Sequence, residues 1–442
     1  MTGAQSAVDL RDLQSLVVFR RPAPYWGSFF LIAFDRPQRG RRLLDHLLSQ
    51  VVSAADWAAG HRDVSVSVAV TYPGLAALGV PPTSLASFPD QMRLGMAARA
   101  DRLGDVGDSD PAHWHAPFGT GGVHAIVSIT AATRALWRDR VAAALDAFDH
   151  AGVRLLDRGD VAAHQGMRTT FGYRDGISSP NIAGLPVSPV AAFEEPIATG
   201  EFLLGHPSET GQPLAMPRPD RLGHNGSYIG LRKIHTRVAE FRRFLQANAA
   251  DPDAEEFLAA KLLGRWRSGA PLILAPHADD PELAADPSRV NRFGYADDPS
   301  GLVCPAGAHI RRVNPRDSAL ATLTDVRIHR ILRFGAVYGE PLADGVLQDD
   351  QVDRGVYFMF LSARPNALEF LKGNWLDDGG FISLGDEQDP IAGANDGHGS
   401  YTLPAKPLRR RLRGLDRFTV TRGGEYAFLP SLTALRWLAD PG

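Results

Sequence analysis

An alternating run of valine and serine at residues 64–70 is the feature that most restricts the possible folds of this chain. A period of two places every valine on one face, so the run predicts a β-strand with one buried face. Apolar segments predict further strands at residues 29–34 and 123–129. Apolar residues at helical spacing predict helices at residues 41–57 and 131–148. Strand, helix, strand, strand, helix is the order of a ferredoxin-like α+β unit.

A second structured part is expected after residue 225. Between residues 154 and 225 glycine and proline are frequent and long periodic runs are scarce, so this stretch predicts loops that build a site. The domain boundary is expected between residues 180 and 225, and we place it after residue 200. The later segments predict helices at residues 238–249 and 253–266, a strand at residues 356–362 and a short helix at residues 365–375.

The composition is that of an ordinary globular protein and excludes several classes of function. With 44% hydrophobic and 22% charged residues and a net charge of −3, the chain has no basic field that would attract nucleic acid. No window reaches the about 18 apolar residues of a membrane span, so no membrane partner is expected. A single cysteine, Cys304, excludes an internal disulfide and a thiolate metal cage. Residues 1–12 lack the apolar run of a secretory signal, and we expect a cytoplasmic location.

The first segment with potential chemistry is residues 301–316, which contains His309 behind small residues and three arginines after it. Small residues allow a flat ligand to approach closely. Neutral imidazole is a common protein ligand of haem iron, and arginines suit the haem carboxylates. The alternative, a core histidine followed by a solvated basic face, is the commoner role of a single histidine.

The second segment is residues 171–180, where Asp175 lies in a Gly-x-x-Asp-Gly sequence. Its glycines permit unusual backbone angles and close contact with a ligand. A carboxyl group held over an iron can take a proton from one peroxide oxygen and return it to the other. The alternative is a turn aspartate that binds its own backbone.

The third segment, residues 330–339, contains Arg330 and Arg333. A fixed guanidinium near a peroxide would stabilise the charge that develops as the O–O bond breaks. The alternative is a strand with outward arginines, and no local feature separates the two residues.

Together these segments resemble the dye-decolorizing peroxidase family. Cys304-Pro-Ala-Gly-Ala-His-Ile-Arg-Arg-Val-Asn-Pro-Arg316 is similar to its proximal histidine segment, and residues 171–180 are similar to its Gly-x-x-Asp-Gly signature. Residues 330–339 match the segment that bears its distal arginine. Shorter similarities run from end to end, so the resemblance covers nearly the whole chain and is closest to the longer members.

The resemblance implies an α+β fold of two ferredoxin-like domains with haem b between them. On this basis the N-terminal domain spans residues 1–200 and ends in the loop with the distal aspartate. The haem-binding domain spans residues 201–442. The implied activity is that of a haem peroxidase, with hydrogen peroxide and small aromatic reductants such as dyes and phenolics as partners.

Residue by residue, the resemblance makes His309 the axial ligand of the iron, Asp175 the distal acid–base group and Arg333 the distal arginine. Arg333 is preferred to Arg330 because its spacing to the following Tyr-Gly pair fits the family segment. Some members carry a polar side chain just after this arginine. Phe334 and Gly335 depart from that pattern, which puts a distal asparagine partner in doubt.

The same reasoning assigns supporting residues. A carboxylate should bind the second ring nitrogen of the axial histidine, with Asp389 as the candidate and Asp386 and Glu387 as rivals. Binding of the haem carboxylates is assigned to Arg311 and Arg316. The lining of the cofactor pocket is assigned to Ile177 and Phe358, with Val356. Electron relay is assigned to Tyr338, ahead of Trp375 and Trp266. The alternatives are exposed loop or surface positions for the charged residues and plain core packing for the others.

Two other functions compete with the peroxidase. A non-catalytic haem carrier or sensor needs the His309 pocket but not the pair of Asp175 and Arg333. A hydrolase that uses Cys304 and His309 is weaker, because Pro305 removes a backbone N–H where an oxyanion hole often draws on the residue after the nucleophile.

Overall fold

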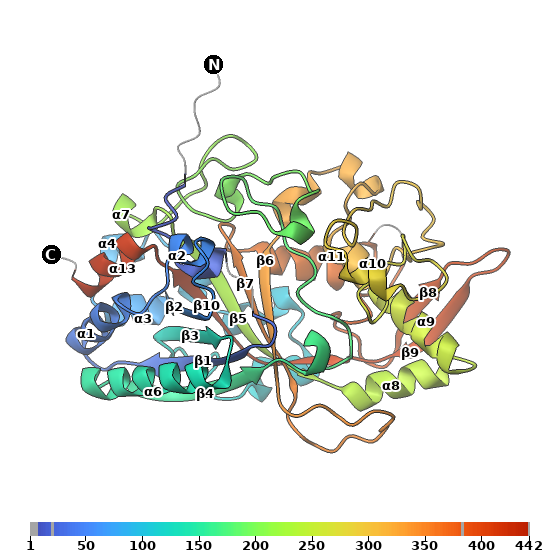
Figure 1. Cartoon of the computed structure of the whole chain (residues 1–442), viewed down its shortest axis with the longest axis horizontal. Coiled ribbons are helices and arrows are strands. Elements are labelled where there is room, and N and C mark those ends of the chain that lie inside the picture. Colours follow the sequence, from blue (N-terminus) through green and yellow to red (C-terminus); the bar gives the residue numbers. More distant parts are fainter. Residues whose placement is uncertain (1–7, 19–21, 382–383, 441–442) are drawn as a thin grey trace.

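The computed structural model describes residues 8–18, 22–381 and 384–440, which form an α+β fold built on one eight-stranded antiparallel sheet (Figure 1). The strand order is β4-β1-β3-β2-β10-β5-β7-β6. The cytoplasmic location was expected from residues 1–12, of which residues 1–7 lie outside the described residues. Among the residues in these ranges, no helix has the length and apolar character needed to cross a membrane.

The first half of the sheet confirms the ferredoxin-like unit expected from the sequence, because its strand order is β4-β1-β3-β2. The predicted helix at residues 41–57 is instead two helices, and the Oγ of Ser53 accepts the Asp56 N–H at the start of the second. The elements are β1 (Trp26–Ala33), α1 (Pro37–Leu48), α2 (Ala54–Ala58), β2 (Val64–Val70), α3 (Tyr72–Ala77), α4 (Pro82–Leu85), α5 (Asp90–Leu94), β3 (Ala125–Ala131), α6 (Arg134–Ala151) and β4 (Arg154–Ala162).

Strand β4 is an element that the sequence pattern did not predict. It pairs with β1 at the edge of the sheet, and most of its side chains are exposed or half-buried. An edge strand of this kind has no clear apolar alternation, so residues 154–162 were expected to form a loop.

The valine–serine strand β2 is buried on both faces, which corrects the expectation of one buried face. Its valines pack with apolar residues of α1 and α6. Ser65 and Ser67 are buried on the other face, where the Oγ of Ser15 lies 2.8 Å from the Oγ of Ser65. The serines are therefore covered by the N-terminal segment and not by solvent.

The second half of the sheet, β10-β5-β7-β6, repeats the ferredoxin-like strand order. The predicted helices and strand of this half are present within a few residues of their expected ends. The elements are α7 (Asp220–Gly223), β5 (Ser227–Thr236), α8 (Val238–Ala247), α9 (Pro252–Leu263), α10 (Pro281–Ala285), α11 (His309–Val313), β6 (Leu332–Tyr338), β7 (Gly355–Ser362), α12 (Ala367–Phe370), a π-helix (Leu371–Leu376), β8 (Gly399–Leu403), β9 (Arg410–Leu415), β10 (Thr419–Leu429) and α13 (Leu432–Ala439).

The two halves are joined through the last strand and the last helix of the chain. Val70 of β2 pairs with Phe428 of β10, and α13 packs against α1. The ring centroids of Phe29 in β1 and Tyr357 in β7 are 5.2 Å apart, so one face of the first half also packs against the second half. Neighbouring strand residues point to opposite faces, so Phe358 lies on the other face of β7. The boundary after residue 200 stays a prediction.

Candidate active site

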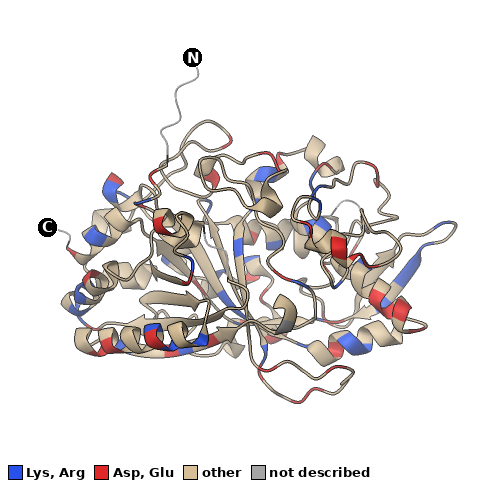
Figure 2. Ribbon diagram, in the orientation of Figure 1, with Lys and Arg blue, Asp and Glu red and all other residues tan. Residues whose placement is uncertain are grey.

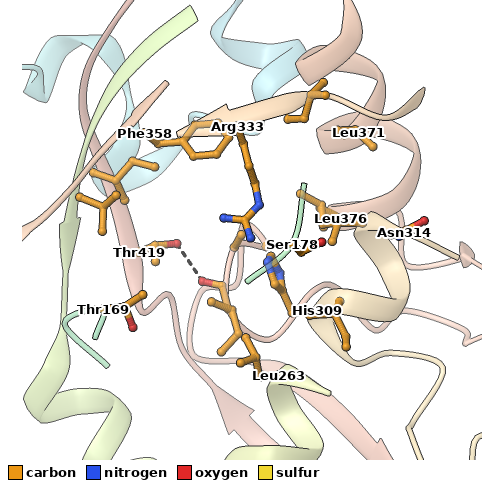
Figure 3. A pocket seen from close by; sticks show the side chains of 18 of the residues that line it. Thr169, Ser178, Leu263, His309, Asn314, Arg333, Phe358, Leu371, Leu376 and Thr419 are labelled. Atoms are coloured by element: carbon orange, nitrogen blue, oxygen red, sulfur yellow. Dashed lines mark hydrogen bonds between the residues drawn. The ribbon is translucent and has the colours of Figure 1, made fainter. Parts of the chain in front are cut away.

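A cavity of about 380 Å³ lies between α11, the loop around residues 169–180 and one face of the second half of the sheet. His309 is in its wall, and so are Asp175 and Arg333 from the other two predicted segments. Figure 3 shows the imidazole of His309 and the guanidinium of Arg333 pointing toward one another across this space. Three segments that are far apart in sequence therefore meet in one site.

His309 is the first residue of α11, and the carboxylate of Asp389 binds the Nδ1 atom of its ring. The Nδ1 atom lies 3.1 and 3.0 Å from the two carboxylate oxygens. The backbone N–H groups of Ile391 and Ala392 donate to the same carboxylate at 2.8 and 2.7 Å. A carboxylate accepts from Nδ1–H, so the neutral ring keeps its Nε2 lone pair free for a ligand.

Asp389 is completely buried, yet it stays ionised. Burial alone would raise its pKa, but His309, the Ala392 N–H and the nearby Arg312 outweigh this effect and lower the pKa. Arg312 is itself buried and donates to the carbonyl oxygens of Trp375 and Glu387. The structure therefore provides a fixed negative charge directly behind His309.

The rival carboxylates of Asp386 and Glu387 have other partners. Glu387 is buried and accepts the Thr402 N–H at 2.9 Å. Asp386 is exposed and pairs with Arg411 at 2.7 Å. Within the described residues, Asp389 is therefore the candidate that forms a hydrogen bond with His309.

Asp175 lies beside Arg333, with 3.5 Å between a carboxylate oxygen and a guanidinium nitrogen. The Gly176 N–H donates to Asp175 Oδ1 at 2.7 Å, and the Asp175 N–H donates to the carbonyl of Met167 at 3.0 Å. Gly176 has a φ of 76°, in the left-handed region that glycine adopts at low cost. The loop therefore holds the carboxylate close to the arginine.

Gly335 follows Arg333 by two residues on β6 and faces the same side of the sheet. A Cβ atom at this position would lie 3.4 Å from Asp175 Oδ2 and 3.4 Å from a methyl group of Val356. A Cβ atom at Gly335 would therefore be in van der Waals contact with both Asp175 and Val356.

No family model matches the chain, but individual proteins do. Peroxidase 2 of Mycetinis scorodonius is 32% identical over 84% of this chain and 76% of that protein. A dye-decolorizing peroxidase of Mycena epipterygia is 30% identical over 98% of this chain and 87% of that protein. The alignment with dye-decolorizing peroxidase msp1 of M. scorodonius covers 57% of that protein, at 34% identity.

Solved structures agree with these relatives. A dye-decolorizing peroxidase in complex with 2,6-dimethoxyphenol superposes with a TM-score of 0.85 at 26% identity, over 98% of this chain and 100% of that one. An ancestral D-type dye-decolorizing peroxidase gives a TM-score of 0.84 at 26% identity, over 98% and 99% of the two chains. The chain belongs to the dye-decolorizing peroxidase family. It is a haem-dependent oxidoreductase, and the non-catalytic carrier is not favoured.

In this dye-decolorizing peroxidase several cationic side chains line the cavity, and two of them, Arg316 and Arg330, are fixed by neighbours in its wall. Arg316 donates to the Phe293 carbonyl at 2.9 Å and lies 4.0 Å from the centre of the Phe293 ring. Arg330 donates to Glu194 at 3.0 Å. Both residues are half-buried or buried, so their charges are fixed in the wall.

The assignment of Arg311 to the haem carboxylates is wrong, because its side chain is buried away from the cavity. It binds Asp298 at 3.2 Å and the Cys304 carbonyl at 2.7 Å. A helix turns by about 100° per residue, so a side chain two residues after His309 points to the opposite side of α11. The small residues before His309 also do not line the cavity, and Gly307 packs against the Tyr401 ring.

Ile177, Phe358 and Val356 line the cavity as expected, whereas Tyr338 does not. Tyr338 lies five residues after Arg333 on the same strand, so it points to the opposite face. It is buried there, and its hydroxyl donates to Asp353 at 3.0 Å. Its role in electron relay stays a prediction. The rival tryptophans are both buried core residues.

Sequence reasoning missed Glu194 and His329. Glu194 connects Arg316 and Arg330, and no motif contains it. His329 lines the cavity with its ring stacked on Phe370 at 3.8 Å. Burial and the charge of Arg364 lower the pKa of His329 to about 4, so its imidazole is neutral at pH 7. In the sequence, the only signal for His329 was its position directly before Arg330.

Proposed function

We propose that this dye-decolorizing peroxidase binds haem b in the cavity through His309, reduces hydrogen peroxide and oxidises dyes, phenolics and similar one-electron donors. The observation that carries the proposal is the arrangement in Figure 3, in which His309 and Arg333 face one another across the cavity. Asp389 lies behind the first residue and Asp175 beside the second.

The residues present fit a haem. Among the described residues no group of three or more His, Cys, Asp or Glu side chains could hold a metal ion. A metal bound through His309 must therefore bring its other ligands with it, as the four pyrroles of haem do. The apolar walls at Ile177 and Phe358 suit the faces of a porphyrin, and Arg316 and Arg330 suit its carboxylates.

The protein groups divide the chemistry between the two sides of the cavity. Bound haem supplies the iron that accepts peroxide and the oxidising equivalents for the organic donor. Asp175 takes the proton of bound hydrogen peroxide on a carboxylate oxygen and returns it to the oxygen that leaves as water. Arg333 stabilises the negative charge on that oxygen as the O–O bond breaks. Asp389 accepts from Nδ1 of His309 and makes the imidazole a stronger ligand.

An absorption spectrum of the purified holoprotein, recorded before and after addition of peroxide, tests this function. We expect a haem band that changes with peroxide and returns when 2,6-dimethoxyphenol or a dye is added. A haem band that does not respond to peroxide, with no dye oxidation, would instead identify a carrier. The cytoplasmic location expected from the sequence stays a prediction, which cell fractionation can test.

Asp389→Asn is expected to slow the reaction with peroxide about 10–100-fold and to raise the reduction potential of the bound haem. The substitution removes the negative charge behind His309, so the imidazole donates less electron density. Stopped-flow kinetics and a spectroelectrochemical titration measure the two effects. The exposed Asp386→Asn is the matched control and should change neither quantity. Equal haem reduction potentials in Asp389→Asn and the wild type would contradict the assignment of Asp389 as the partner of His309.

A further inference from the structure

Phe193 and Arg292 form an exposed pair on the outer side of the cavity wall. The Phe193 side chain is 44% exposed, and the guanidinium carbon of Arg292 lies 5.4 Å from the centre of its ring. Phe293, which follows Arg292, lines the cavity. Glu194, which follows Phe193, does not line it but binds the lining residue Arg330 at 3.0 Å. The pair is thus next to a lining residue on one segment and next to the partner of a lining residue on the other.

The two segments that carry the pair are fixed to each other and to the loop of Asp175. Asn291 is buried, and its Nδ2 donates to the Val190 carbonyl at 2.8 Å and to the Ile177 carbonyl at 2.7 Å. Its Oδ1 accepts from Arg265 at 2.6 Å. A pair held by such a framework loses little conformational freedom when a ligand binds.

The chemistry of the pair fits a planar aromatic anion. An exposed aromatic ring offers a stacking surface, and a guanidinium offers a planar fork of N–H donors for a sulfonate or carboxylate. Arg292 is exposed and forms no ion pair with an acidic side chain of the described ranges. Its charge is therefore available to a ligand.

We propose that Phe193 and Arg292 form a docking subsite for aromatic anions, meaning donors in which a sulfonate or carboxylate is attached to a fused ring system. This proposal rests on the proposed function. A cavity of about 380 Å³ lies near the lower end of the range of about 300–1,000 Å³ for ligand pockets, so we infer that bound haem leaves little of it for a polycyclic dye. Such a donor would be held outside, against the wall that contains Phe293 and Arg316.

A general attraction of anions to positive surface is the competing explanation, and the β8–β9 hairpin provides its control. Figure 2 shows β9 as a mostly positive strand at the edge of the molecule. Arg413 on this strand is exposed like Arg292, but no ring contact is given for it among the described residues. Arg292→Ala and Arg413→Ala therefore remove the same charge, and only the first removes it from beside an aromatic ring.

The test measures binding of anthraquinone-2-sulfonate to the resting holoenzyme by isothermal titration, at low ionic strength and again at high salt. We expect Arg292→Ala to raise the Kd about fivefold, because the sulfonate loses an exposed charge contact with the guanidinium. Phe193→Ala should raise it about threefold. Arg292→Lys keeps the charge but not the planar fork, so its Kd should lie between those of wild type and Arg292→Ala.

Steady-state oxidation separates this proposal from the function itself. We expect KM for a sulfonated anthraquinone dye to rise in Arg292→Ala in step with Kd, while KM for the neutral 2,6-dimethoxyphenol stays unchanged. An unchanged Kd in Arg292→Ala, or an equal rise in Arg413→Ala, would overturn the subsite. Failure of the wild type to oxidise 2,6-dimethoxyphenol with peroxide would overturn the proposed function instead.

Discussion

His309→Ala is expected to lose stable haem binding, with the haem absorption band of the purified protein reduced at least about tenfold relative to its protein band. The reason is the loss of the Nε2 lone pair of His309, which stays free for a ligand in the cavity because Asp389 binds Nδ1. The substitution also leaves the buried carboxylate of Asp389 without its histidine partner, which destabilises the fold around the site. Absorption spectra after reconstitution with a fixed amount of haem measure the loss.

His329→Ala is the matched control for this experiment. His329 also lines the cavity, but its ring stacks on Phe370 and no carboxylate hydrogen bond is given for it among the described residues. We expect this variant to keep its haem. Full haem loading with an unchanged spectrum in His309→Ala would refute the axial assignment, and loss of haem in His329→Ala alone would transfer the role to His329.

The sequence could predict which segments meet, but not which side chain of a segment reaches the site. Asp386, Glu387 and Asp389 lie within four residues of one another, and only the path of the folded loop turns Asp389 toward His309. That path depends on the buried Arg312, which binds the carbonyl of Glu387 and that of Trp375. Contacts of this kind join residues about 75 positions apart and leave no local pattern.

The directions of two side chains follow from their positions along a helix or a strand. Arg311 points away from the cavity because it is two residues from His309 on a helix, and Tyr338 points away because it is an odd number of residues from Arg333 on a strand. Once the secondary structure is known, both directions follow from geometry. The motif match identifies the segment, whereas the period of the backbone decides which of its side chains face the ligand.

The fold shows the same division between local and long-range information. The strong alternation of β2 and the long helix α6 were predicted because their apolar faces contact a core. The edge strand β4 was not predicted, because an edge strand needs few apolar residues. The pairing of β2 with β10 was not predicted either, because Val70 and Phe428 are far apart in the sequence.

Asp175→Asn is expected to slow the reaction of the resting enzyme with peroxide by about 10²–10⁴-fold, because the amide cannot accept and return the peroxide proton. Arg333→Leu is expected to slow the same reaction by about 10²–10³-fold, because the charge on the leaving oxygen loses its stabilising partner. Stopped-flow recording of the haem band at several peroxide concentrations gives both rate constants. Wild-type rates in both variants would refute the distal roles.

Two measurements decide whether these rate losses come from the missing side-chain chemistry or from a disturbed site: the haem content of the two variants, and the rates of Arg333→Lys and Asp175→Glu. Both residues belong to segments other than that of His309, whose ring is held by Asp389, so both variants should keep their haem. Arg333→Lys keeps a positive charge and should recover part of the rate, while Asp175→Glu keeps the proton acceptor at a displaced position.

The double variant Asp175→Asn with Arg333→Leu gives the sharpest result. The two groups are 3.5 Å apart and act on the same O–O bond, so their effects should not multiply. Once the proton no longer reaches the leaving oxygen, an arginine beside that oxygen has less developing charge to stabilise. We therefore expect the double variant to be slower than Asp175→Asn by no more than about tenfold. A loss equal to the product of the single losses would show that Asp175 and Arg333 act in separate steps, and the shared site proposed for them would be wrong.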